Sequence, residues 1–405
     1  MAITPDDPRF AQAKADFIEG LAQLEAGHIE AAERCFGASL QGVPGRVSTL
    51  VNLAAVRLLL GRPNEALESA RQALHGEPDN VDAQLHEATA LAQLGRLEAA
   101  RRGFERLLAA NDGHVAAWTR LAETYKSLGR RDDAMRAYAR ALVLDADQPD
   151  IWSRQGDLLR EASRADEAAQ AFREALARGG DAALNGYYLA SVSGDGTPPP
   201  PTAPAAYVRG LFDGYADDFD QHLRGLLGYE APERLARRLA AHAPFESALD
   251  LGCGTGLCGP LLRPMTRRLV GVDLSGAMLA KARALGVYDE LLQVDLLEAL
   301  GRDEARHDLV VAADVFIYVG ELAPVFAAVH AATLPGALFA FTAEPADDPQ
   351  QGVQLLTSLR YAHSPDYIAG LAQAQGFEVM ALERETIRSE QRRAVEGLYV
   401  VLRRR

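Results

Sequence analysis

A spacing of 34 residues recurs through residues 13–182, and it limits what the first half of the chain can fold into. Small residues mark one position of each period, where the chain has Gly27, Gly61, Gly95, Gly129 and Ser163. Alanine fills a second position each time, as Ala32, Ala66, Ala100, Ala134 and Ala168. A third position is aromatic in all but one period, with Phe36, Ala70, Phe104, Tyr138 and Phe172. A fourth is always small, with Gly20, Ala54, Ala88, Ala122 and Gly156. Each period therefore predicts two helices joined by a turn. The small residues let the helices approach closely, and the aromatic side chains fill the space between repeats.

This period and these residues resemble the tetratricopeptide repeat (TPR). The resemblance implies an all-α solenoid of about five repeats with a final capping helix, together spanning residues 13–192. Stacked repeats form a concave groove, and we expect it to bind a peptide or a protein, as partner or substrate. The alternative is an array that only dimerises the protein or braces its second half, so the sequence leaves a homo-oligomer open.

The composition changes at residues 193–205. This stretch holds four consecutive prolines, Pro198–Pro201, and then Pro204, which favours an extended, semi-rigid spacer. We place the domain boundary here. Over residues 206–405 helices alternate with seven apolar, strand-like segments, which predicts a mostly parallel, doubly wound α/β sheet.

The most informative motif of the second half is the run Asp250–Gly256, which reads Asp-Leu-Gly-Cys-Gly-Thr-Gly. It lies between a strand-like stretch, residues 245–251, and a helix-like stretch, residues 257–262. Glycine accepts positive φ and has no Cβ, and a helix start presents backbone N–H groups, so this turn suits a nucleotide-like ligand. Residues 254–259 also fit the dinucleotide fingerprint, which leaves NAD as an alternative. Asp250 argues against NAD, because its carboxylate would repel a pyrophosphate and attract the ammonium group of a methionine moiety.

The whole run resembles motif I of the class I S-adenosylmethionine (SAM) methyltransferases. The resemblance covers about residues 206–405. It implies a seven-stranded Rossmann-like domain that uses SAM, releases S-adenosylhomocysteine (SAH) and belongs to EC 2.1.1.-. With the repeats in front, the chain is similar to bacterial TPR-containing methyltransferases of the ubiquinone/menaquinone-biosynthesis type. Three functions stay open: methylation of a peptide or protein that the array captures, methylation of a small molecule with the array serving assembly, and a non-catalytic SAM-binding scaffold.

The expected cofactor site extends beyond the glycine run. Asp273, at the end of the second strand, can accept both ribose hydroxyls, although it could instead cap the next helix. The resemblance implies that Asp295 accepts the adenine amino group, that Leu296 packs on the ring, and that Met278 touches ribose or adenine. A solvated loop for Asp295 and a core position for Met278 are the plainer alternatives. The complete set of residues expected to bind the cofactor is Tyr207, Tyr215, Asp250, Gly252, Cys253, Gly254, Gly256, Asp273, Leu274, Met278, Asp295, Leu296 and, through its backbone, Asp314.

Residues 206–236 resemble the N-terminal lid of these enzymes, with the pattern Phe-Asp-x-Tyr-Ala-x-x-Phe-Asp starting at Phe212. The resemblance implies that Tyr207, Tyr215 and Phe219 contact the methionine end of SAM or shield its sulfonium. The alternative is a helix that packs on the sheet through the same rings.

Methyl transfer depends on holding the nucleophile, the methyl group and the sulfur in line, so it requires no catalytic triad. His222 and His363 are the candidate general bases, because imidazole titrates near neutral pH. A lone histidine is more often structural. Tyr318 and Glu321, after the fourth strand, are expected to face the acceptor.

Charge and composition exclude several function classes. The net charge of −14 argues against general binding to nucleic acids or anionic membranes. The chain has no run of about 18 apolar residues, and residues 1–10 do not read as a secretory signal. Cys35, Cys253 and Cys258 have spacings that suit neither zinc nor a redox pair, so we expect reduced thiols and no metal site. These features predict a cytoplasmic protein.

Overall fold

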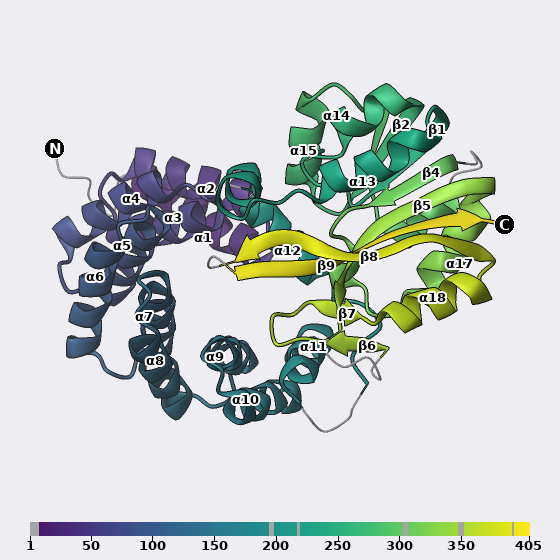
Figure 1. The fold of residues 1–405 in the computed structure, drawn as a ribbon. Helices are drawn as coiled ribbons and strands as arrows, with labels where there is room; N and C mark the ends of the chain where they lie inside the picture. The colour runs from purple at the N-terminus through teal and green to yellow at the C-terminus, as the bar shows by residue number, and fades with distance from the viewer. Residues whose placement is uncertain (1–7, 194–197, 217–218, 303–306, 347–351, 391–392) are drawn as a thin grey trace. The chain divides into compact units, whose positions relative to one another are not determined.

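The computed structural model describes residues 8–193, 198–216, 219–302, 307–346, 352–390 and 393–405. The chain forms two compact units that divide between Gly180 and Asp181. In Figure 1 the first unit runs from purple to teal, and the second from teal through green to yellow.

The first unit is built from pairs of helices that follow the predicted repeat. The pairs are α1 (Pro8–Glu25) with α2 (Ile29–Gly42), α3 (Val47–Leu59) with α4 (Pro63–Gly76), α5 (Val81–Gln93) with α6 (Leu97–Ala110), α7 (Val115–Ser127) with α8 (Arg131–Leu144), and α9 (Pro149–Glu161) with α10 (Ala165–Ala177). The predicted all-α repeat array is confirmed.

Each repeated position has a physical role in this unit. Backbone φ at the five turn positions lies between 58° and 78°, the left-handed region that glycine adopts without strain. The repeated alanines are fully buried. A Cβ added at Gly20 would lie 2.6 Å from the ring of Phe36, and one at Gly156 would lie 2.6 Å from the ring of Phe172. The small position is therefore required by the aromatic side chain of the paired helix.

The second unit is a mixed α/β fold. Its strands are β1 (Phe245–Leu251), β2 (Thr266–Asp273), β3 (Glu290–Gln293), β4 (His307–Ala312), β5 (Thr333–Pro345), β6 (Val353–Leu355), β7 (Tyr361–His363), β8 (Phe377–Glu390) and β9 (Arg393–Arg404). Its helices are α11 (Ala182–Val192), α12 (Ala205–Tyr215), α13 (Ala231–Leu239), α14 (Gly259–Leu262), α15 (Gly276–Ala284), α16 (Leu296–Arg302), α17 (Ala323–Ala332) and α18 (Pro365–Ala374), with the short turns η1 (Gln221–Leu226), η2 (Ala240–His242), η3 (Arg263–Met265) and η4 (Phe316–Tyr318).

The strand order is β3-β2-β1-β4-β5, with these five parallel, followed by β9 and β8 as an antiparallel pair. The seven predicted strands and the doubly wound arrangement are confirmed. The short strands β6 and β7 are additional: β7 pairs in parallel with the end of β5, and β6 pairs with β7. Because the carboxyl ends of parallel strands meet at one edge, the loops that follow β1, β2 and β4 gather there.

Both faces of the sheet are covered (Figure 1). Leu249 of β1 belongs to the cluster that contains Phe326 of α17, whereas the adjacent Ala248 belongs to the cluster that contains Leu235 of α13. Alternate residues of one strand thus face opposite layers, as the pleat of a strand dictates. Among the described residues, no helix has both the length and the apolar character needed to cross a bilayer.

The segment between the predicted domains differs from expectation. Tyr187 of α11 is fully buried and donates to the carbonyl of Leu359, so this helix packs within the second unit, although the sequence assigned it to the array as a cap. The proline stretch is likewise attached: Pro201 O accepts from the N–H groups of Gly320 and Glu321, at 2.9 and 2.8 Å. Proline has no N–H to donate but keeps its carbonyl acceptor, so neighbouring donors can still bind a proline-rich segment. We call residues 198–201 the proline strap. Residues 194–197 lie outside the described part.

Candidate cofactor and acceptor site

The glycine loop joins β1 to α14. Gly252, Gly254 and Gly256 have φ of 62°, 56° and 91°, so all three need a conformation that other residues rarely adopt. A Cβ at Gly252 would lie 2.6 Å from the side chain of Val315. Cys253 contributes its N–H, which donates to Val272 O on the neighbouring strand at 2.9 Å. The loop is therefore fixed by its backbone.

Asp273 links this loop to the one after β2. Its Oδ2 accepts from Gly254 N at 2.9 Å, and its Oδ1 accepts from Ser275 N at 2.8 Å. Ser275, whose side chain accepts from Met278 N, is the N-cap of α15, so the capping alternative for Asp273 is not the one the structure adopts. Burial raises the pKa of Asp273, and the backbone hydrogen bonds oppose that shift.

Asp250 lies beneath the loop, where its side chain does not face solvent. It is 1% exposed, and its Oδ2 accepts from the hydroxyl of Tyr288 at 2.7 Å. Burial raises the pKa of Asp250 to about 7, and the negative charge of Asp273 adds to the shift. No motif in the sequence pointed to Tyr288, which precedes β3 and is brought to Asp250 by the pairing of strands.

Two lid carboxylates reach the same loops. Asp213 Oδ1, at the end of α12, accepts from Ser275 Oγ at 2.5 Å and from Ala277 N at 3.5 Å. Asp220 Oδ1 accepts from Thr255 Oγ1 at 2.5 Å. Both aspartates belong to the lid pattern, but sequence reasoning had singled out only its aromatic residues. Residues 217–218 of that pattern lie outside the described part.

The aromatic residues of the lid separate into two groups. Phe212 packs edge-on against Phe219 and against Tyr318, with ring centroids 5.9 and 5.6 Å apart, and Tyr215 lies 5.4 Å from Phe219. This group covers the loop after β4. Tyr207 instead packs with Tyr187 and Tyr188, at 5.6 and 6.1 Å.

The residues expected to contact adenine and ribose have the following surroundings within the protein. Met278 is fully buried, as a core residue would be. Asp295 accepts from Leu297 N at 2.8 Å at the start of α16, and Leu296 packs against the core. The carbonyl of Leu274 accepts from Gln293 Nε2 at 3.3 Å.

The structure describes the side chain of one of the two candidate general bases. His363 is fully buried, with its Nε2 donating to Gly320 O at 3.0 Å and its ring stacked on Tyr367. Burial lowers its pKa to about 4, so this imidazole is neutral near pH 7 and holds the loop after β4. His222 lies in η1, and its side chain is outside the described part.

Three residues from β5, β8 and the loop after β4 form a charged group. Asp314, which has a φ of 61°, donates its N–H to Thr342 Oγ1 at 2.8 Å. Arg388 Nη1 lies 3.3 Å from Asp314 Oδ2, and its Nη2 lies 3.5 Å from Glu344 Oε2. Sequence reasoning missed Glu344 and Arg388, since they lie far apart in the chain and in no recognisable motif.

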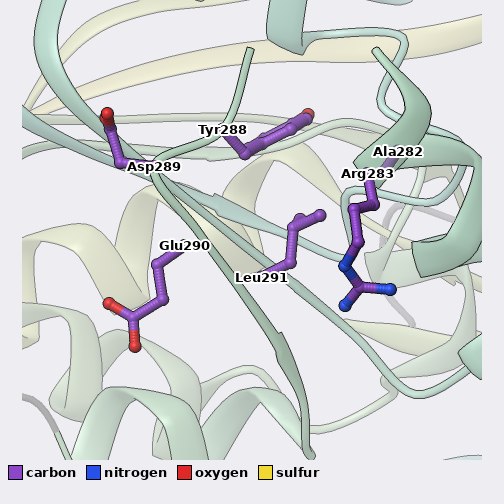
Figure 2. Close-up of a pocket in the computed structure, with 6 residues that line it drawn as sticks. All are labelled: Ala282, Arg283, Tyr288, Asp289, Glu290 and Leu291. Carbon is purple, nitrogen blue, oxygen red and sulfur yellow. The ribbon is translucent and has the colours of Figure 1, made fainter. Parts of the chain in front are cut away.

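A cavity of about 230 Å³ opens at the start of β3 (Figure 2). Its lining residues are Ala282, Arg283, Tyr288, Asp289, Glu290 and Leu291. Pockets for cofactors usually measure about 300–1,000 Å³, so this cavity is smaller than a typical cofactor pocket. It borders the glycine loop, because a Cβ at Gly256 would lie 3.1 Å from the ring of Tyr288 and 3.3 Å from the Cα of Ala282.

Comparison with known proteins agrees with this geometry. A family described as "Methyltransferase domain" matches residues 249–339, and tetratricopeptide repeat families match residues 19–81, 57–113 and 115–158. Malonyl-[acyl-carrier protein] O-methyltransferase of Enterobacter lignolyticus is 31% identical over 143 residues, which are 35% of this chain and 54% of that protein. The chain thus spans about half the length of this curated relative.

Solved structures resemble each half. Magnesium protoporphyrin IX methyltransferase from Synechocystis PCC 6803 with bound SAM is 16% identical, with a TM-score of 0.40, over 50% of this chain and 97% of that one. A thermophilic TPR protein of Thermus thermophilus is 25% identical, with a TM-score of 0.38, over 41% of this chain and 91% of that one.

The fold and the glycine loop define the second unit as a class I methyltransferase domain. The first unit carries tetratricopeptide repeats between residues 19 and 158, so the chain joins a repeat array to a methyltransferase domain.

Proposed function

We propose that this protein binds SAM at the glycine loop and transfers its methyl group to an acceptor at the carboxyl edge of β4 and β5. The observation that carries this proposal is a convergence of carboxylates on the glycine loop and on the adjacent loop after β2. Asp250 and Asp273 come from the strands, and Asp213 and Asp220 come from the lid. The negative charge of Asp213 contributes to the raised pKa of Asp273, and that of Asp273 contributes to the raised pKa of Asp250.

Such an arrangement favours a cationic ligand. SAM carries a positive sulfonium and an ammonium group, whereas NAD carries an anionic pyrophosphate that these carboxylates would repel. An ionised carboxylate has about four acceptor sites, and Asp273 uses two on backbone N–H groups, which leaves capacity for ribose hydroxyls. The other predicted cofactor contacts, including those of Tyr215 and Asp295, belong to this proposal.

We further propose that the array recruits a peptide or a protein, in keeping with its repeats. The charges on α7 and α9 do not indicate whether that ligand is acidic or basic, because they pair with one another. Lys126 pairs with Asp157 and Glu161 at 3.1 and 3.3 Å, and Arg154 pairs with Glu123. The name of the curated relative describes an acceptor group that is carried by a protein. The second candidate is therefore a small acceptor group that a carrier protein delivers.

We also propose that the protein is located in the cytoplasm. Its three free cysteines fit this reducing compartment.

Isothermal titration calorimetry of the full chain with SAH, SAM and NAD tests the cofactor assignment. We expect binding of SAH and SAM and none of NAD. Binding of NAD alone would refute the proposal. SAM binding without label transfer, after incubation with methyl-labelled SAM and a lysate, would favour the non-catalytic scaffold.

A further inference from the structure

A buried arginine holds two carboxylates together at the carboxyl edge of the sheet. Arg388 approaches Asp314 at 3.3 Å and Glu344 at 3.5 Å, and these residues follow or end β4, β5 and β8 in turn. Arg360 also approaches Glu344, at 3.9 Å. Asp314 is expected to border the cofactor through its backbone only, so the side chains of this cluster are not among the expected cofactor contacts.

The long β8–β9 hairpin brings Arg388 to this edge. The pairing of β5 with β9 ends at Ala343 and Leu398, and Leu398 pairs with Arg384 of β8. Beyond that point β8 and β9 continue as a two-stranded ribbon, in which Arg388 pairs with Val395 (Figure 1). A shorter hairpin would end before this position, so the extension supplies the guanidinium.

The cluster lies next to the proposed cofactor loop. β4 pairs directly with β1, and Val315, the residue after Asp314, packs where a Cβ of Gly252 would be. Glu344 lies one strand farther from the loop, because β5 follows β4 in the sheet. Asp314 is therefore the carboxylate of the cluster closest in the sheet order to the glycine loop.

Burial differs within the cluster. The side chain of Arg388 is 2% exposed, while those of Asp314 and Glu344 are 19% and 16% exposed. Arg388 is thus the most deeply buried member of the cluster, and the two carboxylates lie nearer the surface. Tyr318, whose ring packs edge-on against Phe212 of the lid, interacts electrostatically with Asp314 and Arg388.

We propose that Asp314 and Glu344, held by Arg388, recognise the methyl acceptor and select a hydroxyl or an amine over a carboxylate. This inference rests on the proposed function. A lone pair of the acceptor oxygen or nitrogen forms the bond to the methyl carbon, the carbon–sulfur bond breaks, its electron pair stays on sulfur to give SAH, and the acceptor proton passes to Asp314. A carboxylate acceptor would bring no proton and would meet two anions, which is unfavourable.

A SAM analogue tests this without knowledge of the acceptor. Sinefungin carries an amine in place of the S-methyl group, and this amine, when protonated, would lie where the methyl group faces the acceptor. We expect wild-type protein to bind sinefungin more tightly than SAH in calorimetry. Asp314→Asn should reduce this preference about tenfold or more, and Glu344→Gln should reduce it less, while the affinity for SAH changes little. Asparagine tolerates the positive φ at this position, so the substitution preserves the backbone.

The matched control is Asp308→Asn, at the other end of the same strand. Asp308 accepts from Glu246 N and Ser247 N, far from the carboxyl edge, so its loss should leave the preference for sinefungin unchanged. An equal preference in wild type, Asp314→Asn and Glu344→Gln would overturn the inference. Absence of binding of both SAH and sinefungin to wild-type protein would refute the proposed function, and the inference with it.

The chemistry of the product gives a second test. Methyl esters of carboxylates release labelled methanol in mild alkali, whereas methyl ethers and N-methyl groups are stable. After transfer from methyl-labelled SAM in a lysate, the label should therefore remain in the product in alkali. Release of most of the label as methanol would contradict the selection of a hydroxyl or an amine.

Discussion

The repeat array and the methyltransferase unit differ in how far along the chain their supporting contacts reach. In the array, Gly20 makes room for Phe36 of the next helix, and the same contact recurs between Gly156 and Phe172. In the methyltransferase unit, Asp250 depends on Tyr288, and Asp314 depends on Arg388. Damage to the array should therefore reduce the stability of the array alone, while damage to the site should change binding.

The largest expected effect tests the array. Phe104 of α6 is fully buried among neighbouring repeats, so Phe104→Ala should reduce the free energy of unfolding of the array by about 3–5 kcal/mol. The affinity for SAH should not change. Denaturant unfolding followed by the two tryptophans, Trp118 and Trp152, both in the array, would measure the first quantity and calorimetry the second. Loss of SAH binding by a folded variant would show that the array contributes to the site.

The next effect concerns how the stability of the methyltransferase unit depends on pH. Because burial raises the pKa of Asp250 to about 7, the folded state holds this proton above pH 4, where the unfolded state releases it. The contribution of Asp250 to stability is thus complete below about pH 4 and is lost as the pH rises towards 7 and beyond. Asp250→Asn, which can still accept from Tyr288, should remove this loss, on the order of 4 kcal/mol. Measuring the free energy of unfolding of wild type and Asp250→Asn at several pH values tests this prediction. The same pH dependence in both proteins would contradict it.

A smaller effect, on binding, separates the site from its scaffold. Asp273→Ala should weaken SAH binding at least 100-fold, or about 3 kcal/mol, because the proposed ribose contacts are lost. The control is Asp289→Ala, which removes a carboxylate that pairs with Arg263 at the amino end of β3. Calorimetry should show normal affinity for the control. Equal affinities for both variants would discredit the ribose assignment.

The smallest effect concerns the proline strap. Tyr361 OH donates to Pro200 O at 2.7 Å, so Tyr361→Phe should cost about 1 kcal/mol and loosen the strap. The amides of Gly320 and Glu321, which donate to Pro201 O, should then exchange faster with solvent. The same change in the array, Tyr125→Phe, removes a hydrogen bond to Glu105 and should leave these amides unaffected. Unchanged exchange in Tyr361→Phe would show that the strap is held by other contacts.

The same contrast explains how much could be predicted from the sequence. The repeats were predictable because each turn and each aromatic contact lies within one period. The glycine loop was predictable because a contiguous motif carries it, and Asp273 because it ends the next strand-like segment. The partners of Asp250 and Asp314 were not, since only the pairing of the strands brings Tyr288 and Arg388 to them. The proline strap was expected to be a spacer because composition shows the missing N–H donors and does not show which N–H groups will reach the carbonyls.

A crystal structure of the full chain with SAH tests the central claim most directly. We predict density for SAH beside Gly254, with its ribose hydroxyls on the carboxylate of Asp273 and the lid aspartates close to the loop. SAH bound elsewhere, or a crevice beside Gly254 that stays empty at saturating SAH, would contradict the account.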